Sequence, residues 1–126
     1  MPGSNVDTGR QGEAAARDFL GKKGYHILRS NYRTRFGEID IIARDKDTLC
    51  FIEVKTRHQD RFGTAAESVI LPKQKKIYKA AAKFLKENNL FDHKARFDVV
   101  TITYAKDRLE PELIKNAFVL DNEFNY

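Results

Sequence analysis

The chain has 126 residues, 41% of them hydrophobic and 33% charged, which is enough for one domain with a modest core. Lysine and arginine number 23 against 18 aspartates and glutamates, a net charge of +5. This excess is compatible with a nucleic-acid partner, and equally with a basic surface that serves only solubility.

A single cysteine, Cys50, excludes an internal disulfide framework and a thiolate metal site, and it fits a reducing, cytoplasmic location. No apolar run approaches the ~20 residues of a membrane span, so we expect no membrane association. Residues 1–8 lack the basic and apolar pattern of a secretory signal and are interpreted as a flexible leader. Residues 9–126 are expected to form a single domain.

The first predicted element is a helix over residues 9–23. Thr8 and Gln11 have the spacing of a capping box, and Gly21 and Gly24 end the pattern. Its apolar residues recur at helical spacing: Ala15, Ala16, Phe19 and Leu20.

Strands are predicted next wherever β-branched and aromatic residues concentrate. A loop over 56–65 precedes a second helix, which Pro72 suits as a first-turn residue and which Asn88 and Asn89 end. The order is α-β-β-β-α-β, an α/β fold. The predicted strands are residues 25–32, 38–44, 49–55 and 96–104, and a short strand or extended segment over 117–120 is expected to close the domain.

Charged residues interrupt the apolar run GEIDIIARDKDTLCFIEVKTR, residues 37–57. Side chains alternate across a strand, so Glu53 and Lys55 share a face with Leu49 and Phe51. In the preceding strand one face carries Glu38, Asp40 and Ile42, and the other carries Ile39, Ile41 and Ala43. Each strand therefore gathers its charged residues on one side.

The length of the hairpin loop decides whether the two charged faces coincide. A four-residue loop over 45–48 would oppose Arg44 to Leu49, and hence Asp40 to Glu53. A two-residue loop keeps the shared face, whereas a three-residue loop separates the faces unless a bulge restores them. We predict the shared face.

Two neighbouring carboxylates either share a proton or hold a cation. Oxygen ligands select a hard ion such as Mg²⁺, and a nearby lysine can position water or stabilise charge on a phosphate. Asp40, Glu53 and Lys55 would then form a metal-assisted phosphodiester hydrolase. The alternative is a Glu38–Lys55 ion pair across the strands of a solvated sheet face.

Asp40, followed thirteen residues later by Glu53-Val54-Lys55, resembles the PD-(D/E)XK nuclease signature. The proline of that name is absent, since Ile39 precedes Asp40, but many members lack it. The chain is more specifically similar to the bacterial YraN family of nuclease-like proteins, and it resembles archaeal Holliday-junction resolvases. The matching stretches are GRQGE (9–13), GEIDIIARD (37–45), FIEVKTR (51–57), AAESV (65–69) and RFDVV (96–100).

The resemblance implies a restriction-endonuclease-like core, in which helices flank a mixed sheet. It implies that Asp40 and Glu53 bind Mg²⁺ or Mn²⁺ and that Lys55 is the catalytic lysine. Glu13 would add an acid from the first helix, although an ion pair with Arg17 is the alternative. Gln74 is analogous to a polar residue of the second helix in some relatives; the alternative is a solvated side chain.

The expected partner is nucleic acid, with DNA favoured over RNA and branched DNA among the candidates. A homodimer is compatible with cutting both strands. A nucleic-acid-binding module of the same fold without efficient catalysis is the rival hypothesis. Basic residues near the site would bind phosphates, or else be solvated: Arg10, Arg33, Arg35, Arg57, Arg61, Lys73 and Lys76.

Overall fold

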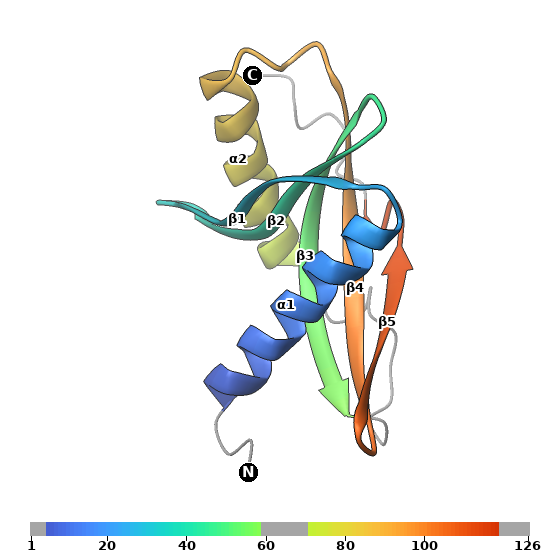
Figure 1. Cartoon of the computed structure of the whole chain (residues 1–126). Helices are drawn as coiled ribbons and strands as arrows, with labels where there is room; N and C mark the ends of the chain where they lie inside the picture. The colour runs from blue at the N-terminus through green and yellow to red at the C-terminus, as the bar shows by residue number, and fades with distance from the viewer. Residues whose placement is uncertain (1–4, 59–70, 119–126) are drawn as a thin grey trace.

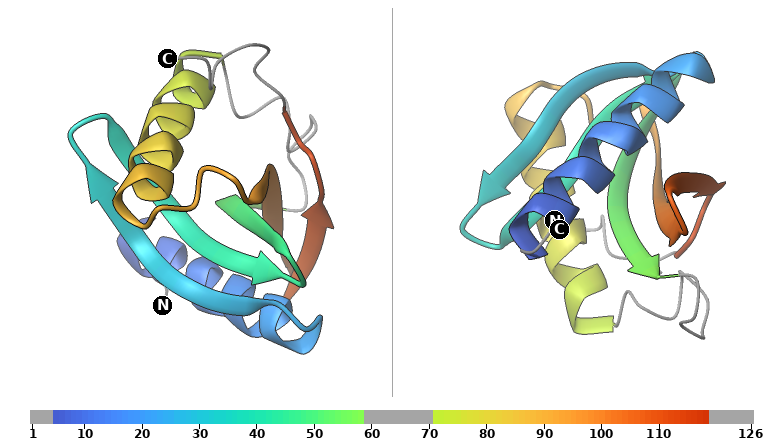
Figure 2. Two further views of the ribbon diagram at one scale, coloured as in Figure 1. Left: turned by 90° about the horizontal axis from the view of Figure 1, so that it is seen from above. Right: turned by 60° about the horizontal axis from the view of Figure 1, so that its bottom comes forward.

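A computed structural model of the chain describes residues 5–58 and 71–118. Two helices lie on opposite faces of a curved five-stranded sheet (Figures 1 and 2). This arrangement confirms the α/β class and the predicted order. The elements are α1 (Asn5–Lys22), β1 (His26–Thr34), β2 (Gly37–Asp45), β3 (Thr48–His58), α2 (Leu71–Glu87), β4 (Lys94–Ala105) and β5 (Arg108–Ile114).

The strands lie in the sequential order β1-β2-β3-β4-β5, and only β3 and β4 run parallel. The sheet is therefore mixed, as expected. β3 and β4 pair over the whole length of β3, from Thr48–Lys94 to His58–Tyr104. α2 connects these two strands, because parallel neighbours need a crossover. None of the helices within residues 5–58 and 71–118 is long and apolar enough to cross a bilayer.

Each sheet face carries its own hydrophobic cluster. On the α2 face, Phe51 packs edge-on against Phe84, and their ring centroids are 6.0 Å apart. On the α1 face, Ala16 and Leu20 are fully buried against a cluster that contains Ile52. Cys50 also belongs to this second cluster. Burial raises the pKa of its thiol to about 12.

Gly12 sets the distance between α1 and β3. A Cβ atom at this position would lie 2.2 Å from the Thr56 Cγ2 atom, closer than atoms can approach. Glycine is therefore required for the helix to pack this closely on the strand. The close approach fixes the position of Glu13, the next residue.

Several predicted boundaries were wrong. α1 begins at Asn5, so Thr8 is not its cap and part of the predicted leader is helical. β3 continues to His58, which places the start of the predicted 56–65 loop in the sheet; the remainder of that loop lies outside the described residues. The strand alternative for 117–120 is not met in its described part: β5 precedes it, and Ala117 and Phe118 are not in a strand, although the Ala117 N–H donates to the Phe97 carbonyl at 2.8 Å. Residues 119 and 120 lie outside the described ranges.

Candidate active site

The two acid-bearing strands form a hairpin whose tight turn sets its register. Asp45 pairs with Thr48 and Arg44 with Leu49, so the turn itself is Lys46-Asp47. Lys46 adopts a φ of +56°, the left-handed conformation that such turns require. The predicted opposition of Arg44 and Leu49 is confirmed.

The β2–β3 pairing ends at Ile41–Ile52, and Asp40 lies where the two strands separate, a place we call the fork. Figure 1 shows β2 turning away from β3 beyond this point. The Asp40 Oδ2 atom accepts a hydrogen bond of 2.8 Å from the Val54 backbone N–H. The carboxylate therefore accepts a hydrogen bond from the β3 backbone at the fork, and this bond holds it facing β3.

β2 also changes course here, and one parity prediction fails as a result. Ile39 belongs to the α2-face cluster together with Ile42, rather than to the α1-face cluster of Ile41. On the β1 side Asn31, which adopts a φ of +55°, interrupts the regular conformation of the neighbouring strand. The backbone is therefore irregular both in β2, which carries Asp40, and in the neighbouring strand β1.

Asp40 and Glu53 meet at the fork. Burial, followed by the charge of Glu53, raises the pKa of Asp40 to about 8, and a hydrogen bond between the two side chains and the charge of Glu13 add to this rise. The Val54 N–H opposes the rise without cancelling it. Near neutral pH the pair thus tends to hold a shared proton or attract a cation.

Two lysine amines approach Glu53, whose side chain is only 5% exposed. The Lys73 amine contacts Glu53 Oε2, and the Lys55 Nζ atom lies 3.6 Å from the same oxygen. Burial and the adjacent Lys73 amine lower the pKa of Lys55. Burial also acts to lower the pKa of Lys73, but the hydrogen bond and charge of Glu53 raise it overall. Lys55 is therefore the amine that loses its proton more readily.

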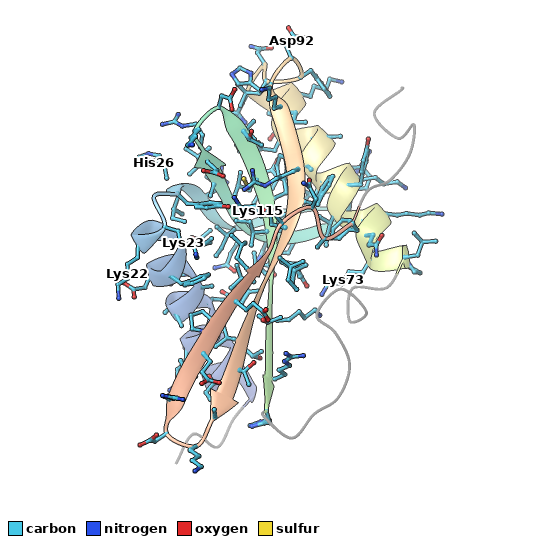
Figure 3. All side chains as sticks on the ribbon, turned by 90° about the vertical axis from the view of Figure 1, so that its right-hand side faces the viewer. Lys22, Lys23, His26, Lys73, Asp92 and Lys115 are labelled. Carbon is cyan, nitrogen blue, oxygen red and sulfur yellow. The ribbon has the colours of Figure 1, made fainter. Side chains whose placement is uncertain are left out.

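A groove of about 380 Å³ opens onto the acid pair between β2 and the first turns of α2. Figure 3 shows Lys73 near the start of α2, with its amine directed toward the sheet. The groove gives a ligand access to Glu53 from the α2 side. Its lining residues are Gly37, Glu38, Asp40, Glu53, Pro72, Lys73, Lys76 and Ile77.

Glu13 reaches the edge of this site from α1. Its charge contributes to the raised pKa of Asp40. The Asn31 side-chain amide, with its nitrogen facing the two acids, donates to Glu13 Oε1 at 3.1 Å and to Glu38 Oε1 at 3.2 Å. Asn31 thus links the helix acid to the groove.

Comparison with known proteins places the chain in a family. The family model described as "Uncharacterised protein family UPF0102" matches residues 12–102. The chain belongs to this family. A UPF0102 protein of Syntrophus aciditrophicus is 47% identical over 116 residues, covering 92% of this chain and 91% of the relative. One of Desulfosudis oleivorans is 52% identical over 110 residues, covering 87% and 88%. The expected YraN family membership is thereby confirmed.

In this UPF0102 protein the predicted acids and the predicted lysine come together. Of the other predicted polar residues, some line the groove and others lie away from it. Gln74 is half-buried in α2, and the groove is lined instead by its neighbours Lys73 and Lys76. The alternative Glu38–Lys55 ion pair is replaced, since Glu38 pairs with Arg33 at 3.4 Å and Lys55 with Glu53.

The predicted arginines do not surround the site evenly. Arg57 is half-buried, and its Nε donates to the Thr103 Oγ1 atom of β4 at 3.3 Å. Arg10 is exposed on α1, and Arg35 lies in the β1–β2 turn. Arg61 lies outside the described residues. Among the predicted arginines that the structure describes, Arg33 contacts Glu38, a residue that lines the acid groove.

Sequence reasoning missed the direct contact between Lys73 and Glu53. Lys73 was predicted only as one of several phosphate-binding lysines of the second helix. The signal was Pro72, which places Lys73 in the first turn of that helix. The sequence contains no pattern that predicts the packing of this first turn over the fork between β2 and β3.

Proposed function

We propose that this UPF0102 protein is a metal-dependent nuclease of the PD-(D/E)XK type that hydrolyses phosphodiester bonds in nucleic acid, with DNA as the favoured substrate. The observation that carries the proposal is the acid pair at the fork. Asp40 and Glu53 are in contact, and the Lys55 amine lies 3.6 Å from Glu53. These are the three residues that the resemblance identifies with metal binding and catalysis.

The residues of the fork fit a hard divalent cation in one specific way. Within the described ranges no three Asp, Glu, His or Cys side chains are grouped to hold a metal ion, so the protein would supply two carboxylates. Mg²⁺ commonly uses one or two carboxylates and keeps several waters. Burial, and then the charge of Glu53, raise the pKa of Asp40, and a bound cation would offset both effects. A third ligand from Glu13 stays a prediction.

The side chains of the site divide the chemistry between them. Asp40 and Glu53 would hold Mg²⁺ or Mn²⁺, which when bound neutralises phosphate charge and lowers the pKa of water. Lys55, with its lowered pKa, orients the attacking water or takes up its proton. Lys73, whose pKa is raised, stays charged and is placed to bind the phosphate once it releases Glu53.

A cleavage assay tests this proposal. Duplex, single-stranded and branched DNA are incubated with Mg²⁺, Mn²⁺ or a chelator. We expect cleavage that needs the cation and is lost in Asp40→Asn, Glu53→Gln and Lys55→Ala. Matched controls are Asp18→Asn and Glu110→Gln, which neutralise exposed acids of surface ion pairs and should retain activity. Cleavage that survives Glu53→Gln comes from a contaminant and rejects the proposal.

The contact between Lys73 and Glu53 favours a second candidate, a nucleic-acid-binding module that does not cut. An ammonium group already neutralises Glu53 and competes with a metal ion for the same oxygen. This candidate predicts salt-dependent DNA binding without cleavage, and no heat of Mg²⁺ binding by isothermal titration. Titration of Lys73→Ala separates the two, since only a functional metal site gains affinity when the competing amine is removed.

A further inference from the structure

A second groove, of about 680 Å³, lies between the β1–β2 turn and the outer face of α2. Four cations, one acid and one aromatic ring line most of it: Arg35, Phe36, Lys79, Lys83, Lys86 and Glu87. Glu87 is already neutralised, because Lys83 contacts it at 2.5 Å and the Tyr32 hydroxyl donates to it at 2.7 Å. The groove therefore presents a net positive charge, which selects an anionic ligand.

Phe36 lines this groove, and hydrogen bonds hold the backbone of the turn that carries it. The Thr34 Oγ1 atom accepts hydrogen bonds from the Phe36 N–H at 3.0 Å and the Gly37 N–H at 3.2 Å, and Thr34 donates to the Gly37 carbonyl at 3.0 Å. These bonds close the turn that carries the ring. An aromatic side chain on a rigid turn is preorganised for stacking.

Two cations flank the Phe36 ring from different elements. The Arg35 Cζ atom lies 4.9 Å from the ring centroid, and the Lys79 Nζ atom lies 5.9 Å from it. A half-buried ring between positive charges provides a flat apolar surface next to sites for anions. Single-stranded nucleic acid has this combination, a π-face on every base and a phosphate between successive bases.

The two grooves are neighbours along the same two elements. Gly37 and Lys76 line the acid groove, whereas Phe36 and Lys79, the adjoining positions, line the second groove. A Cβ atom at Gly37 would lie only 3.5 Å from the Lys76 Cβ atom, so turn and helix are in contact where the grooves meet. The helical rise places Lys76 and Lys86 about 15 Å apart along α2, room for a few nucleotides.

We propose that this second groove, the Phe36 groove, binds unpaired nucleotides that flank the cleavage point, with one base on Phe36 and phosphates on the lysines of α2. The inference rests on the proposed nucleic-acid substrate, and it adds a preference for strands that contain an unpaired segment. A base inside a duplex is stacked on its neighbours and cannot reach the ring, whereas a single-stranded flank can.

The test is fluorescence anisotropy in chelator, so that it reports binding without any cleavage. The probes are a labelled oligothymidylate and an abasic oligonucleotide of the same length, which keeps the phosphates but lacks the bases. Phe36→Leu retains apolar bulk and removes the π-face, so we expect oligothymidylate to bind roughly five- to a hundredfold more weakly. Binding of the abasic probe should be unchanged.

Lys79→Ala tests the phosphate contacts separately. Each lost contact to a single strand should reduce the slope of log K against log salt by about 0.7, for both probes. The matched control is Lys23→Ala, because Lys23 also lies over a phenylalanine ring, at 5.1 Å from the Phe19 centroid. Figure 3 shows Lys23 at the end of α1, on the opposite side of the molecule from Lys73.

The outcomes separate this inference from the proposed nuclease function. If the wild-type protein cleaves DNA but Phe36→Leu and Lys79→Ala bind both probes as the wild type does, the Phe36 groove is rejected and the nuclease stands. If the variants weaken binding but no protein cleaves, the groove stands and catalysis is rejected. An equal loss of both probes in Phe36→Leu, or equal binding of a polyglutamate peptide, rejects base stacking.

Discussion

Two clusters of buried charge lie in the same sheet, and they are built on opposite principles. In the cluster around Arg96, the guanidinium contacts Asp45 at 3.0 Å and the fully buried Asp98 at 2.9 Å. It also donates a hydrogen bond of 2.6 Å to the Tyr25 hydroxyl. The Asn116 N–H donates a hydrogen bond of 3.0 Å to Asp98. Each of these acids has a cationic partner within the cluster.

At the fork, by contrast, the charge that shifts the pKa of Asp40 most is that of another acid, Glu53. The pKa values record the difference. The hydrogen bond from Arg96 lowers the pKa of Asp45, whereas burial and Glu53 raise the pKa of Asp40 to about 8. Burial of charge alone therefore does not indicate a functional site. The indicative feature is a half-buried acid, Asp40, whose charge its surroundings leave poorly compensated.

The largest expected effect distinguishes the clusters by activity. Glu53→Gln should reduce cleavage by about a hundredfold or more, because metal-assisted charge stabilisation is worth several kcal/mol. Its free energy of unfolding should change little, since the substitution relieves repulsion with Asp40 while it weakens the contacts with Lys55 and Lys73, whose side chains are partly exposed to solvent. The measurements are initial cleavage rates and denaturant unfolding of the same preparations. A variant that loses both activity and stability would mean that Glu53 stabilises the fold, as the Arg96 cluster does.

The second effect concerns stability. Arg96→Leu leaves Asp98 buried without its cation, and we expect a loss of about 3–5 kcal/mol in the free energy of unfolding. The control is Arg108→Leu, whose exposed ion pair with Glu110 should contribute less than about 1 kcal/mol. Urea denaturation measures both. If the two substitutions have the same effect, the Arg96 cluster does not stabilise the fold.

The third effect is a pH dependence of the metal-free protein. The pKa of Asp40 rises from 3.8 to about 8, so between these values the folded state binds a proton that the unfolded state has released. The free energy of unfolding should therefore fall as pH rises from about 4 to about 8, by at most about 1.36 kcal/mol per pH unit from this group. Asp40→Asn should remove this decline. A profile that is identical in both proteins would contradict the assignment.

The smallest effect compares two glycines of α1. Gly12→Ala should destabilise the fold by about 1–3 kcal/mol, because the added methyl group would collide with Thr56. Gly21→Ala meets nothing within 4 Å and should stabilise the helix by about 0.5–1 kcal/mol. Thermal unfolding of the two variants measures both signs. Equal shifts would mean that α1 can move away from β3 without loss.

The sequence was informative where one local rule decides the structure. The register of the β2–β3 hairpin follows from a short polar turn, so the opposition of Arg44 and Leu49 could be predicted. Alternation along β3 likewise placed Glu53 and Lys55 on the same face as Leu49 and Phe51, which the structure shows to be the α2 face.

The sequence was uninformative where tertiary context overrides local pattern. β5 contains Pro111 and several charges and reads as a loop, yet an edge strand tolerates both because one side needs no partner. The fork at Asp40 could not be predicted, because the alternation of residues along β2 does not indicate that Ile39 packs on the α2 side. The Phe36 groove joins residues of two elements and has no continuous motif.

The long parallel pairing of β3 with β4 has a consequence for the order of folding. Thr48 and Lys94 are far apart in the chain, so this pairing must wait until α2 has bridged the distance, whereas the β2–β3 hairpin closes through local contacts. We therefore expect Asp40 and Glu53 to approach each other early, before Lys73 arrives with α2. The repulsion of the acids would then oppose the first steps of folding, and the amine of the crossover helix would remove that opposition late.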